Sequence, residues 1–128
     1  MDWSVIGSIA STVAVIVTLV TFMIQWRRNK KVETLRALDE IYDAYYLLDG
    51  KEPAKDYRAC VAYINKVNRF AIAFNGGVYD KKAVKGQASI FFKAQYDRFV
   101  RDIIEQRRKQ FKRDNYYHDI VEMVNSIS

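Results

Sequence analysis

The sequence predicts an all-α protein in which a single N-terminal transmembrane helix is followed by a small cytoplasmic helical bundle. Residues 3–26 form one apolar stretch without a charged side chain, and later residues carry apolar side chains at the three-and-four spacing of helices. No stretch shows the sustained alternation of a strand. We therefore divide the chain into a transmembrane anchor with a short external N-terminus at residues 1–28 and one cytoplasmic helical domain at residues 29–128.

The apolar stretch at residues 3–26 predicts the anchor. At a rise of about 1.5 Å per residue, a helix of this length crosses the roughly 30 Å hydrocarbon core of a bilayer. A cleaved signal peptide would have a positive N-terminal region, a shorter apolar core and a small-residue cleavage site, and the sequence has none of these. Every Lys and Arg follows the stretch, so the positive-inside rule places the N-terminus outside and the rest in the cytoplasm.

Aromatic and basic residues flank the stretch where membrane interfaces favour them. The residues expected to contact lipid headgroups are Trp3, Trp26, Arg27, Arg28, Lys30 and Lys31. A second basic cluster lies at residues 107–113, in a chain of formal net charge +6. Cations suit the C-terminal end of a helix and an anionic leaflet, so we expect this cluster to be a solvated helix end or a lipid contact. An anionic small ligand, such as a nucleotide second messenger, is the alternative, and the membrane tether argues against nucleic acid.

Small and polar residues line one side of the expected membrane helix. They recur at spacings of three and four, and they are Ser4, Gly7, Ser11, Ala14, Thr18, Thr21 and Gln25. In hydrocarbon, helices associate through close approach at small residues and through hydrogen bonds of Ser, Thr and Gln. We therefore predict self-association, or docking on another membrane protein, through this stripe. The alternative is that the hydroxyl groups bond back to their own helix. The uncharged interior argues against a water-filled pore.

The first two helices are predicted from apolar spacing and from helix breakers. We expect the first helix to continue from the anchor to about Leu48, with Gly50 ending it. Pro53 is expected to open the second helix, and Gly76-Gly77 to end it. The expected buried face of the second helix contains Tyr57, Cys60, Val61, Ile64, Val67, Ala71 and Phe74.

Two further helices complete the expected bundle. Asp80 is expected to cap a short helical turn through Val84, and a third long helix is expected after Gly86. A final helix is expected over residues 115–127. The inward residues of the third helix are expected to be Phe91, Phe92, Tyr96, Phe99, Val100, Ile103 and Ile104.

The sequence offers little material for catalysis. The chain has one His and one Cys, whereas a hydrolase or transferase needs a nucleophile with a positioned base. Cys60 lies on an apolar helix face, where burial as a small hydrophobe is expected, and His118 is expected at the surface. Neither paired metal ligands nor a glycine-rich phosphate loop occurs. We therefore expect no enzyme, no metal and no cofactor.

The most informative polar segment covers residues 65–80, with the sequence NKVNRFAIAFNGGVYD. Asn68 is in register with the buried residues of its helix, so we expect its amide to be buried and hydrogen-bonded. One interpretation is a structural bond that holds the loop at Gly76-Gly77. The other is a recognition surface formed by Asn68, Arg69, Asn75 and Asp80.

Four parts of the chain are distinctive together. They are MDWSVIG at the start, QWRRNKK after the anchor, YINKVNRFAIAFNGGVYD in the middle, and Arg107-Arg108 followed by Asn115-Tyr116. These segments resemble the small bacterial and prophage proteins of the family called domain of unknown function 4760. The resemblance covers nearly the full length and implies a single anchor followed by a cytoplasmic helical domain, without an assigned activity. Phe91-Phe92 with Tyr96 departs from the family, in which Trp is frequent at this place.

These features together predict a single-pass protein of the bacterial inner membrane whose cytoplasmic domain is an interaction or sensing module. The alternative is a membrane effector that oligomerises on a cytoplasmic signal and perturbs the bilayer. Analogy with the family suggests a prophage, phage-defence or superinfection context for either role. Toxicity or leakage on triggering would separate the effector from the module.

Overall fold

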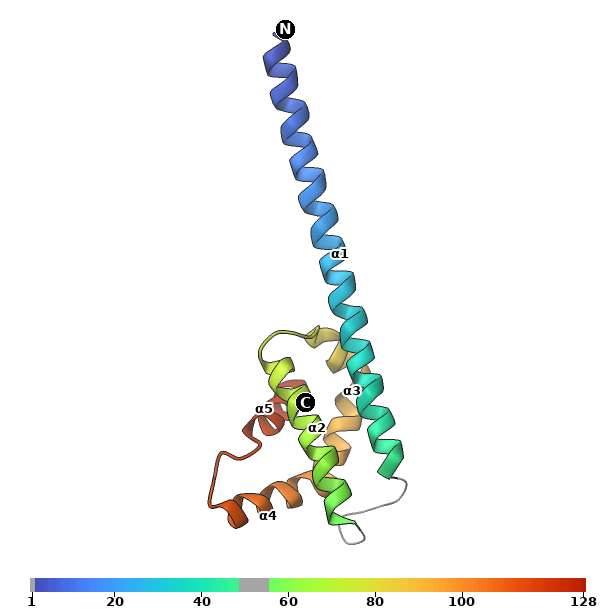
Figure 1. Ribbon diagram of the computed structural model, residues 1–128, viewed down its shortest axis with the longest axis vertical. Helices are drawn as coiled ribbons and strands as arrows, with labels where there is room; N and C mark the ends of the chain where they lie inside the picture. Colours follow the sequence, from blue (N-terminus) through green and yellow to red (C-terminus); the bar gives the residue numbers. More distant parts are fainter. Residues whose placement is uncertain (1, 49–55) are drawn as a thin grey trace.

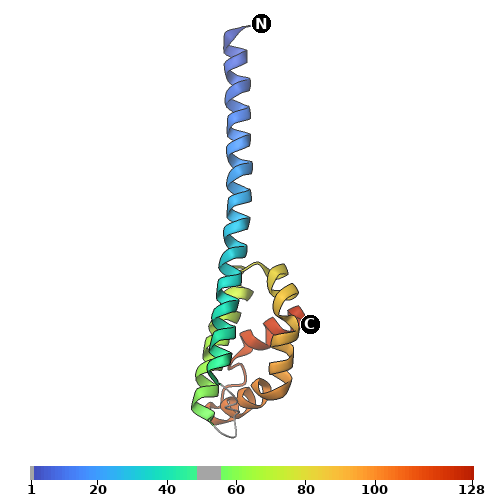
Figure 2. The ribbon, with the colours of Figure 1, turned by 90° about the vertical axis from the view of Figure 1, so that its right-hand side faces the viewer.

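The computed structural model describes residues 2–48 and 56–128, and every regular element in this part of the chain is helical. The elements are α1 (Trp3–Leu48), α2 (Tyr57–Asn75), α3 (Lys81–Gln95), the π-helical turn η1 (Tyr96–Val100), α4 (Arg101–Phe111) and α5 (His118–Ile127). The predicted all-α class is confirmed. Figures 1 and 2 show the other helices packed along one side of the inner half of α1, while the outer half extends alone toward the N-terminus.

Helix α1 is continuous over 46 residues, as predicted. Its inner half presents Thr34, Leu38, Ile41 and Leu48 to the bundle at helical spacing, and all four are buried. Its outer half has no buried side chain. Because one unbroken helix contains both halves, the position of the bundle along the axis of the protruding segment is fixed. The predicted stop at Gly50 lies outside the described residues.

Helix α2 begins and ends at capping residues. The side chain of Asp56 accepts a hydrogen bond from the Ala59 N–H at 3.1 Å, so α2 begins at Tyr57. The predicted opening residue, Pro53, lies outside the described residues. The predicted end is confirmed, because Gly76 is the C-cap and Gly77 adopts a φ of 80°, which favours glycine. The buried residues of α2 are Cys60, Tyr63, Ile64, Val67, Phe70, Ala71 and Phe74.

Helix α3 is longer than the sequence predicts. Asp80 caps it as expected, since its carboxylate accepts from the Ala83 N–H at 3.1 Å. The predicted break at Gly86 is wrong, because α3 runs through this residue to Gln95. Gly86 is exposed, and an added Cβ atom would meet no neighbour within 4 Å. A helical glycine costs only about 1 kcal/mol relative to Ala, and burial of Val84, Ala88 and Phe92 on the other side offsets this cost.

The π-helical turn η1 joins α3 directly to α4, and α4 runs across the foot of the bundle at a marked angle to α3 (Figure 1). The sequence predicts one long helix here, but it gives no sign of the wider turn. The predicted burial of Phe92, Phe99, Val100, Ile103 and Ile104 is confirmed, whereas Phe91 and Tyr96 are half-buried. A π-helical turn contains one residue more than an α-helical turn. With this turn in place, α3, η1 and α4 all direct apolar side chains into the core.

A buried polar pair lies inside the aromatic core. The hydroxyl of Tyr63 donates to Oε1 of Gln95, and Gln95 is only 6% exposed. Burial raises the pKa of Tyr63 well above its ordinary value. Neighbouring rings pack at right angles or stack, as in Tyr42 against Phe91 at 4.6 Å and Phe70 against Tyr79 at 4.8 Å.

Helix α5 begins at His118 rather than at residue 115 as predicted. Tyr117, immediately before it, has a left-handed φ of 63°, which excludes it from the helix. Its hydroxyl donates to Oδ1 of Asn65 at 2.6 Å, and Asn75 donates to the carbonyl oxygen of Asp119 at 3.0 Å. These two bonds attach the start of α5 to α2.

A hydrogen bond also joins the start of α3 to α1. The Asp80 N–H donates to Oγ1 of Thr34 at 2.8 Å, and the Thr34 hydroxyl donates to the carbonyl oxygen of Lys30 at 2.7 Å. Thr34 is fully buried. This bond sets the position of the first turn of α3 along α1.

We expect Thr34→Val to lower the free energy of unfolding of the bundle by about 1–2 kcal/mol, because the half-buried Asp80 N–H loses its acceptor. Urea unfolding of the detergent-solubilised chain, followed by circular dichroism, measures this change. Thr12→Val is the matched control, because the exposed Thr12 hydroxyl only bonds back to the Ser8 carbonyl oxygen. Equal unfolding midpoints for the two variants would contradict the expectation.

Candidate functional site

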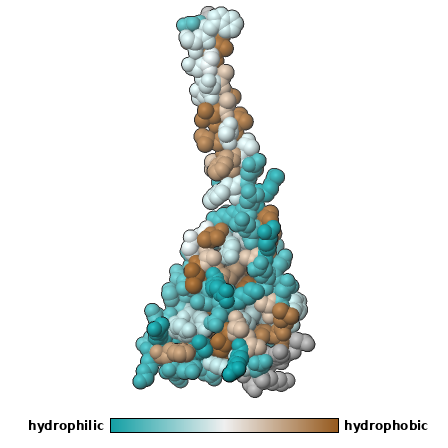
Figure 3. Space-filling view, in the orientation of Figure 1, coloured by the Kyte–Doolittle hydropathy of each residue, from teal (hydrophilic) through white to brown (hydrophobic). Residues whose placement is uncertain are grey.

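The outer half of α1, residues 3–26, is called the apolar segment below. None of its side chains is buried, and its central residues Val13, Leu19 and Phe22 are 55%, 57% and 64% exposed. Figure 3 shows apolar and weakly polar side chains along this segment, with hydrophilic ones gathering where the helix meets the bundle. A contiguous apolar surface of this extent marks a partner other than water. This helix is the one in the described chain that is long and apolar enough to cross a membrane.

Aromatic and basic side chains surround the inner end of the apolar segment. Trp26 is 56% exposed, and the Lys30 ammonium lies 5.1 Å from the centre of its ring. Arg27, Arg28 and Lys31 are exposed. At the other end, Trp3 is 84% exposed. These residues have the arrangement of interfacial anchors, with aromatic rings at the ends and cations on one side only.

The seven residues predicted to mediate helix association all lie on the exposed apolar segment. The Thr18 hydroxyl donates to the carbonyl oxygen of Ala14 at 2.8 Å, which is the intrahelical bond of the alternative explanation. The Thr18 oxygen can still accept a bond from a second helix. At Gly7, an added Cβ atom would meet no neighbour within 4 Å, so this position is open to a partner. Association itself stays a prediction.

The basic cluster at residues 107–113 lies at the far end of the bundle. Figures 1 and 2 place α4 opposite the apolar segment, near the inner end of α1. That end is about 33 Å along the helix from Trp26, whereas charges are screened over roughly 8 Å at physiological salt. A bilayer around the apolar segment would therefore be out of reach, which favours the predicted solvated helix end over the predicted lipid contact.

Within this cluster, two arginines hold the loop between α4 and α5. The Arg107 guanidinium lies 4.9 Å from the Phe111 ring and 5.6 Å from the Tyr116 ring, and Arg108 Nε donates to the Tyr116 carbonyl oxygen at 2.8 Å. A hydrogen bond with Tyr116 raises the pKa of Arg107, and the same bond lowers the pKa of Tyr116. The cluster is thus a largely solvated helix end with a structural role.

The four residues predicted as a recognition surface have separate environments. Asp80 caps α3, and Asn75 binds α5, so both have structural partners. Asn68 is half-buried, and no hydrogen-bond partner for its Oδ1 occurs within the described ranges, so the predicted bond is wrong for this atom. Arg69 is exposed. Their joint role in recognition stays a prediction.

Arg69 lines a small cavity between α1 and α2. The cavity has a volume of about 210 Å³, and its lining residues are Ala37, Glu40, Ile41, Lys66, Arg69, Phe70 and Tyr79. Burial raises the pKa of Tyr79, and the charges of Glu40 and Glu33 add to the rise. Two cations and one carboxylate suit a small ligand that carries both charges, or an anion.

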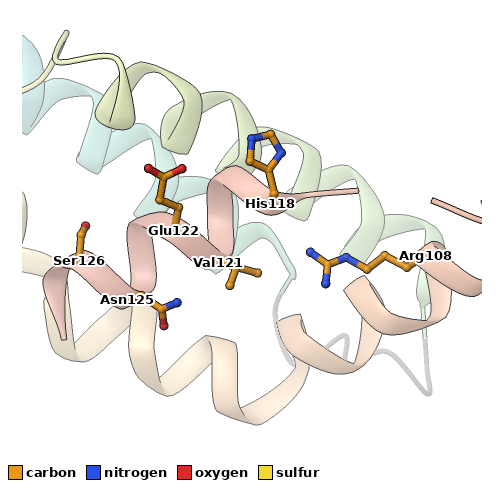
Figure 4. Close-up of a pocket in the computed structure, with 6 residues that line it drawn as sticks. All are labelled: Arg108, His118, Val121, Glu122, Asn125 and Ser126. Atoms are coloured by element: carbon orange, nitrogen blue, oxygen red, sulfur yellow. The ribbon is translucent and has the colours of Figure 1, made fainter. Parts of the chain in front are cut away.

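A larger cavity of about 570 Å³ lies between α4 and α5. Its lining residues are Arg108, His118, Val121, Glu122, Asn125 and Ser126. In Figure 4, His118 and Glu122 extend to one side of α5, while Val121 and Asn125 extend to the opposite side. Arg108 Nε donates to the Tyr116 carbonyl oxygen, and the two terminal nitrogens of the Arg108 guanidinium remain available to this cavity.

Three possible metal ligands gather at the start of α5, which the sequence analysis did not predict. The ligand atoms of His118, Asp119 and Glu122 lie within 4.8 Å of one another. The spacing of four residues between His118 and Glu122 is the signal that could have indicated them. His118 is exposed, as predicted, and Nδ1 lies 3.2 Å from the Asn115 carbonyl oxygen.

Comparison with known proteins finds one family. The sequence model described as "Domain of unknown function (DUF4760)" matches residues 8–127, which is nearly the whole chain. No curated protein and no solved structure gives a significant match. The resemblance identified from the sequence is therefore confirmed, and the protein belongs to the DUF4760 family.

Proposed function

We propose that the protein is a single-pass membrane protein whose bundle is an interaction or sensing module in the bacterial cytoplasm. One observation carries the proposal. Helix α1 is unbroken, and its inner half packs into the core while its apolar segment leaves every side chain exposed. A lipid bilayer is the environment that such a segment fits.

The orientation follows from charge. All 21 Lys and Arg side chains lie after the apolar segment, and the four nearest ones immediately follow it. The positive-inside rule therefore places the N-terminus outside and the bundle in the cytoplasm of the inner membrane. The single Cys60, fully buried, is compatible with a reducing compartment.

Sensing or interaction, rather than catalysis, is the role that the bundle supports best. The two cavities are lined by mixed charges, which suit a small charged ligand or a partner surface. Cys60 has no exposed surface, and we expect no catalytic activity from the chain.

Fusion reporters test the anchor and its orientation. A fluorescent protein joined after Ser128 should fluoresce, and alkaline phosphatase at the same position should be inactive, because the C-terminus would face the cytoplasm. Both fusions should stay in the membrane pellet after alkaline washing. Active phosphatase would refute the orientation, and release into the supernatant would refute the anchor.

Self-association through the stripe is the second part of the proposal. Replacing Gly7, Ser11 and Thr18 by Leu should reduce the oligomer measured by crosslinking in lipid, because bulky side chains block close approach. The control replaces Ile9, Val13 and Ile16 by Leu on the opposite side and should change nothing. An unchanged oligomer in the first variant would refute self-association through the stripe and leave the anchor proposal intact.

Dye leakage from vesicles that contain the protein would instead favour the alternative role of a membrane effector.

A further inference from the structure

The loop between α2 and α3 and the first turn of α3 lie at the end of the bundle nearest the apolar segment (Figures 1 and 2). The bond from the Asp80 N–H to Thr34 Oγ1 places this turn beside Thr34. Thr34 is eight residues after Trp26, or about 12 Å along the helix axis. The headgroup layer extends roughly 5–8 Å beyond the hydrocarbon core. Long side chains at this level are therefore close to the headgroups of a bilayer around the apolar segment.

The direction of α3 aims its first side chains at that bilayer. Helix α3 runs away from the apolar segment, and side chains on a helix lean toward its N-terminus. Lys82 and Lys85 are exposed here, and the Lys81 ammonium lies 5.5 Å from the centre of the Phe74 ring. Lys82 and Lys85 are therefore expected to lean toward the side of the bundle that faces the apolar segment.

Lys82 and Lys85 lie near the N-terminal end of α3, where a positive charge is electrostatically unfavourable. The N-terminus of a helix carries partial positive charge, and α3 has no acidic residue in its first turn beyond its capping Asp80. Lys81 and Lys85 also repel each other at a spacing of four residues. Among the described residues, no carboxylate lies within 4 Å of the ammonium group of Lys82 or Lys85. An anion outside the chain would supply the missing partner.

An apolar side chain accompanies the lysines. Val78 is 55% exposed, and its N–H donates to the Ala73 carbonyl oxygen at 3.0 Å, which holds the loop in place. Exposed apolar residues beside cations are typical of surfaces that touch the membrane interface. Because the apolar segment is longer than the hydrocarbon core is thick, it is expected to tilt, and a tilt toward α3 would bring Val78 closer to the headgroups.

From these observations we infer that Val78, Lys82 and Lys85 form a second lipid-binding surface, called the proximal surface, which takes the anionic headgroups of the membrane that holds α1. The inference depends on the proposed anchor. It assigns the contact with the bilayer to positive charges near the start of α3 rather than to those at residues 107–113.

Fluorescence quenching tests the proximal surface in the full chain. A polarity-sensitive dye is attached to Val78→Cys, since the native Cys60 is fully buried. The protein is reconstituted in phosphatidylcholine vesicles with or without phosphatidylglycerol, each containing a lipid with a quencher on its headgroup. We expect several-fold greater quenching with phosphatidylglycerol. A dye at Ile90→Cys, which is 84% exposed and lies farther along α3, should be quenched weakly in both.

Charge variants assign the effect to the lysines. Lys82→Gln with Lys85→Gln should reduce the quenching at position 78 to the level in neutral vesicles, while Lys82→Arg with Lys85→Arg should preserve it. The matched control, Lys109→Gln with Lys112→Gln, removes the same charge at the far end of the bundle and should have no effect. Equal quenching in both vesicle types, or equal loss in the two Gln variants, would overturn the inference.

The two Trp residues separate this inference from the anchor proposal. Trp3 and Trp26 are the only Trp in the chain, and both lie at the ends of the apolar segment. If lipid quenchers reach them but not position 78, the proximal surface is refuted and the anchor stands. If they reach neither, both proposals fail.

Discussion

Val13→Arg combined with Ile16→Arg should abolish membrane integration. The two residues lie near the middle of the apolar segment and are 55% and 54% exposed. Each Arg at the centre of a membrane helix costs roughly 2.5–3.5 kcal/mol, whereas each Val, Leu, Ile or Phe contributes only about 0.3–0.6 kcal/mol. Two Arg therefore cancel most of the gain from the apolar residues. Alkaline extraction of membranes, with quantification of the pellet and supernatant, measures the loss.

The control introduces the same two charges elsewhere. Ile72→Arg with Ile90→Arg changes side chains of the bundle that are 51% and 84% exposed. This variant should remain in the pellet, because neither position lies in the apolar segment. Retention of the Val13 and Ile16 variant at the same level as this control would show that residues 3–26 are not the membrane anchor.

Phe74→Ala should destabilise the bundle by about 3–5 kcal/mol, because it removes a large buried ring and leaves a cavity. Phe74 is 1% exposed near the end of α2, and its ring also lies beneath the Lys81 ammonium. Urea unfolding of the solubilised chain measures the change. Membrane extraction should be unaffected, because the apolar segment is unchanged.

Ile90→Ala is the matched truncation for this test. Ile90 is 84% exposed on α3, so its removal should alter the free energy of unfolding by less than about 0.5 kcal/mol. Similar unfolding midpoints for Phe74→Ala and Ile90→Ala would contradict the proposed core.

The helices that the sequence predicted well are those with a clear local signal. The uninterrupted run of α1, the Asp80 cap and the end of α2 at Gly76-Gly77 each depend on neighbouring residues only. Gly86 misled the prediction because glycine is only weakly unfavourable in a helix, and packing of the opposite side decided the outcome. The π-helical turn η1 has no local signature, since it depends on how two parts of one helix pack against the core.

The candidate sites also divide into those with a local sequence signal and those that depend on the fold. The aromatic and basic residues at the ends of the apolar segment could be recognised from the sequence, because they adjoin the segment directly, and their contact with lipid headgroups stays a prediction. Lys82 and Lys85 lie far from it in the chain, and only the bond between Asp80 and Thr34 reveals how near to it they are. For the basic residues at 107–113, the sequence left a solvated helix end and a lipid contact both open, since net charge carries no information about distance from the apolar segment.

Depth-dependent quenching of Trp fluorescence in the reconstituted chain tests the central claim most directly. Trp3 and Trp26 should be quenched best by lipids that carry the quencher near the headgroup. A single Trp at Val13→Trp, in a chain with Trp3→Phe and Trp26→Phe, should be quenched best by lipids that carry it deep in the acyl chains. Membrane residence of the apolar segment predicts this contrast. Equal quenching of the Trp at position 13 by a water-soluble quencher with and without vesicles would contradict it.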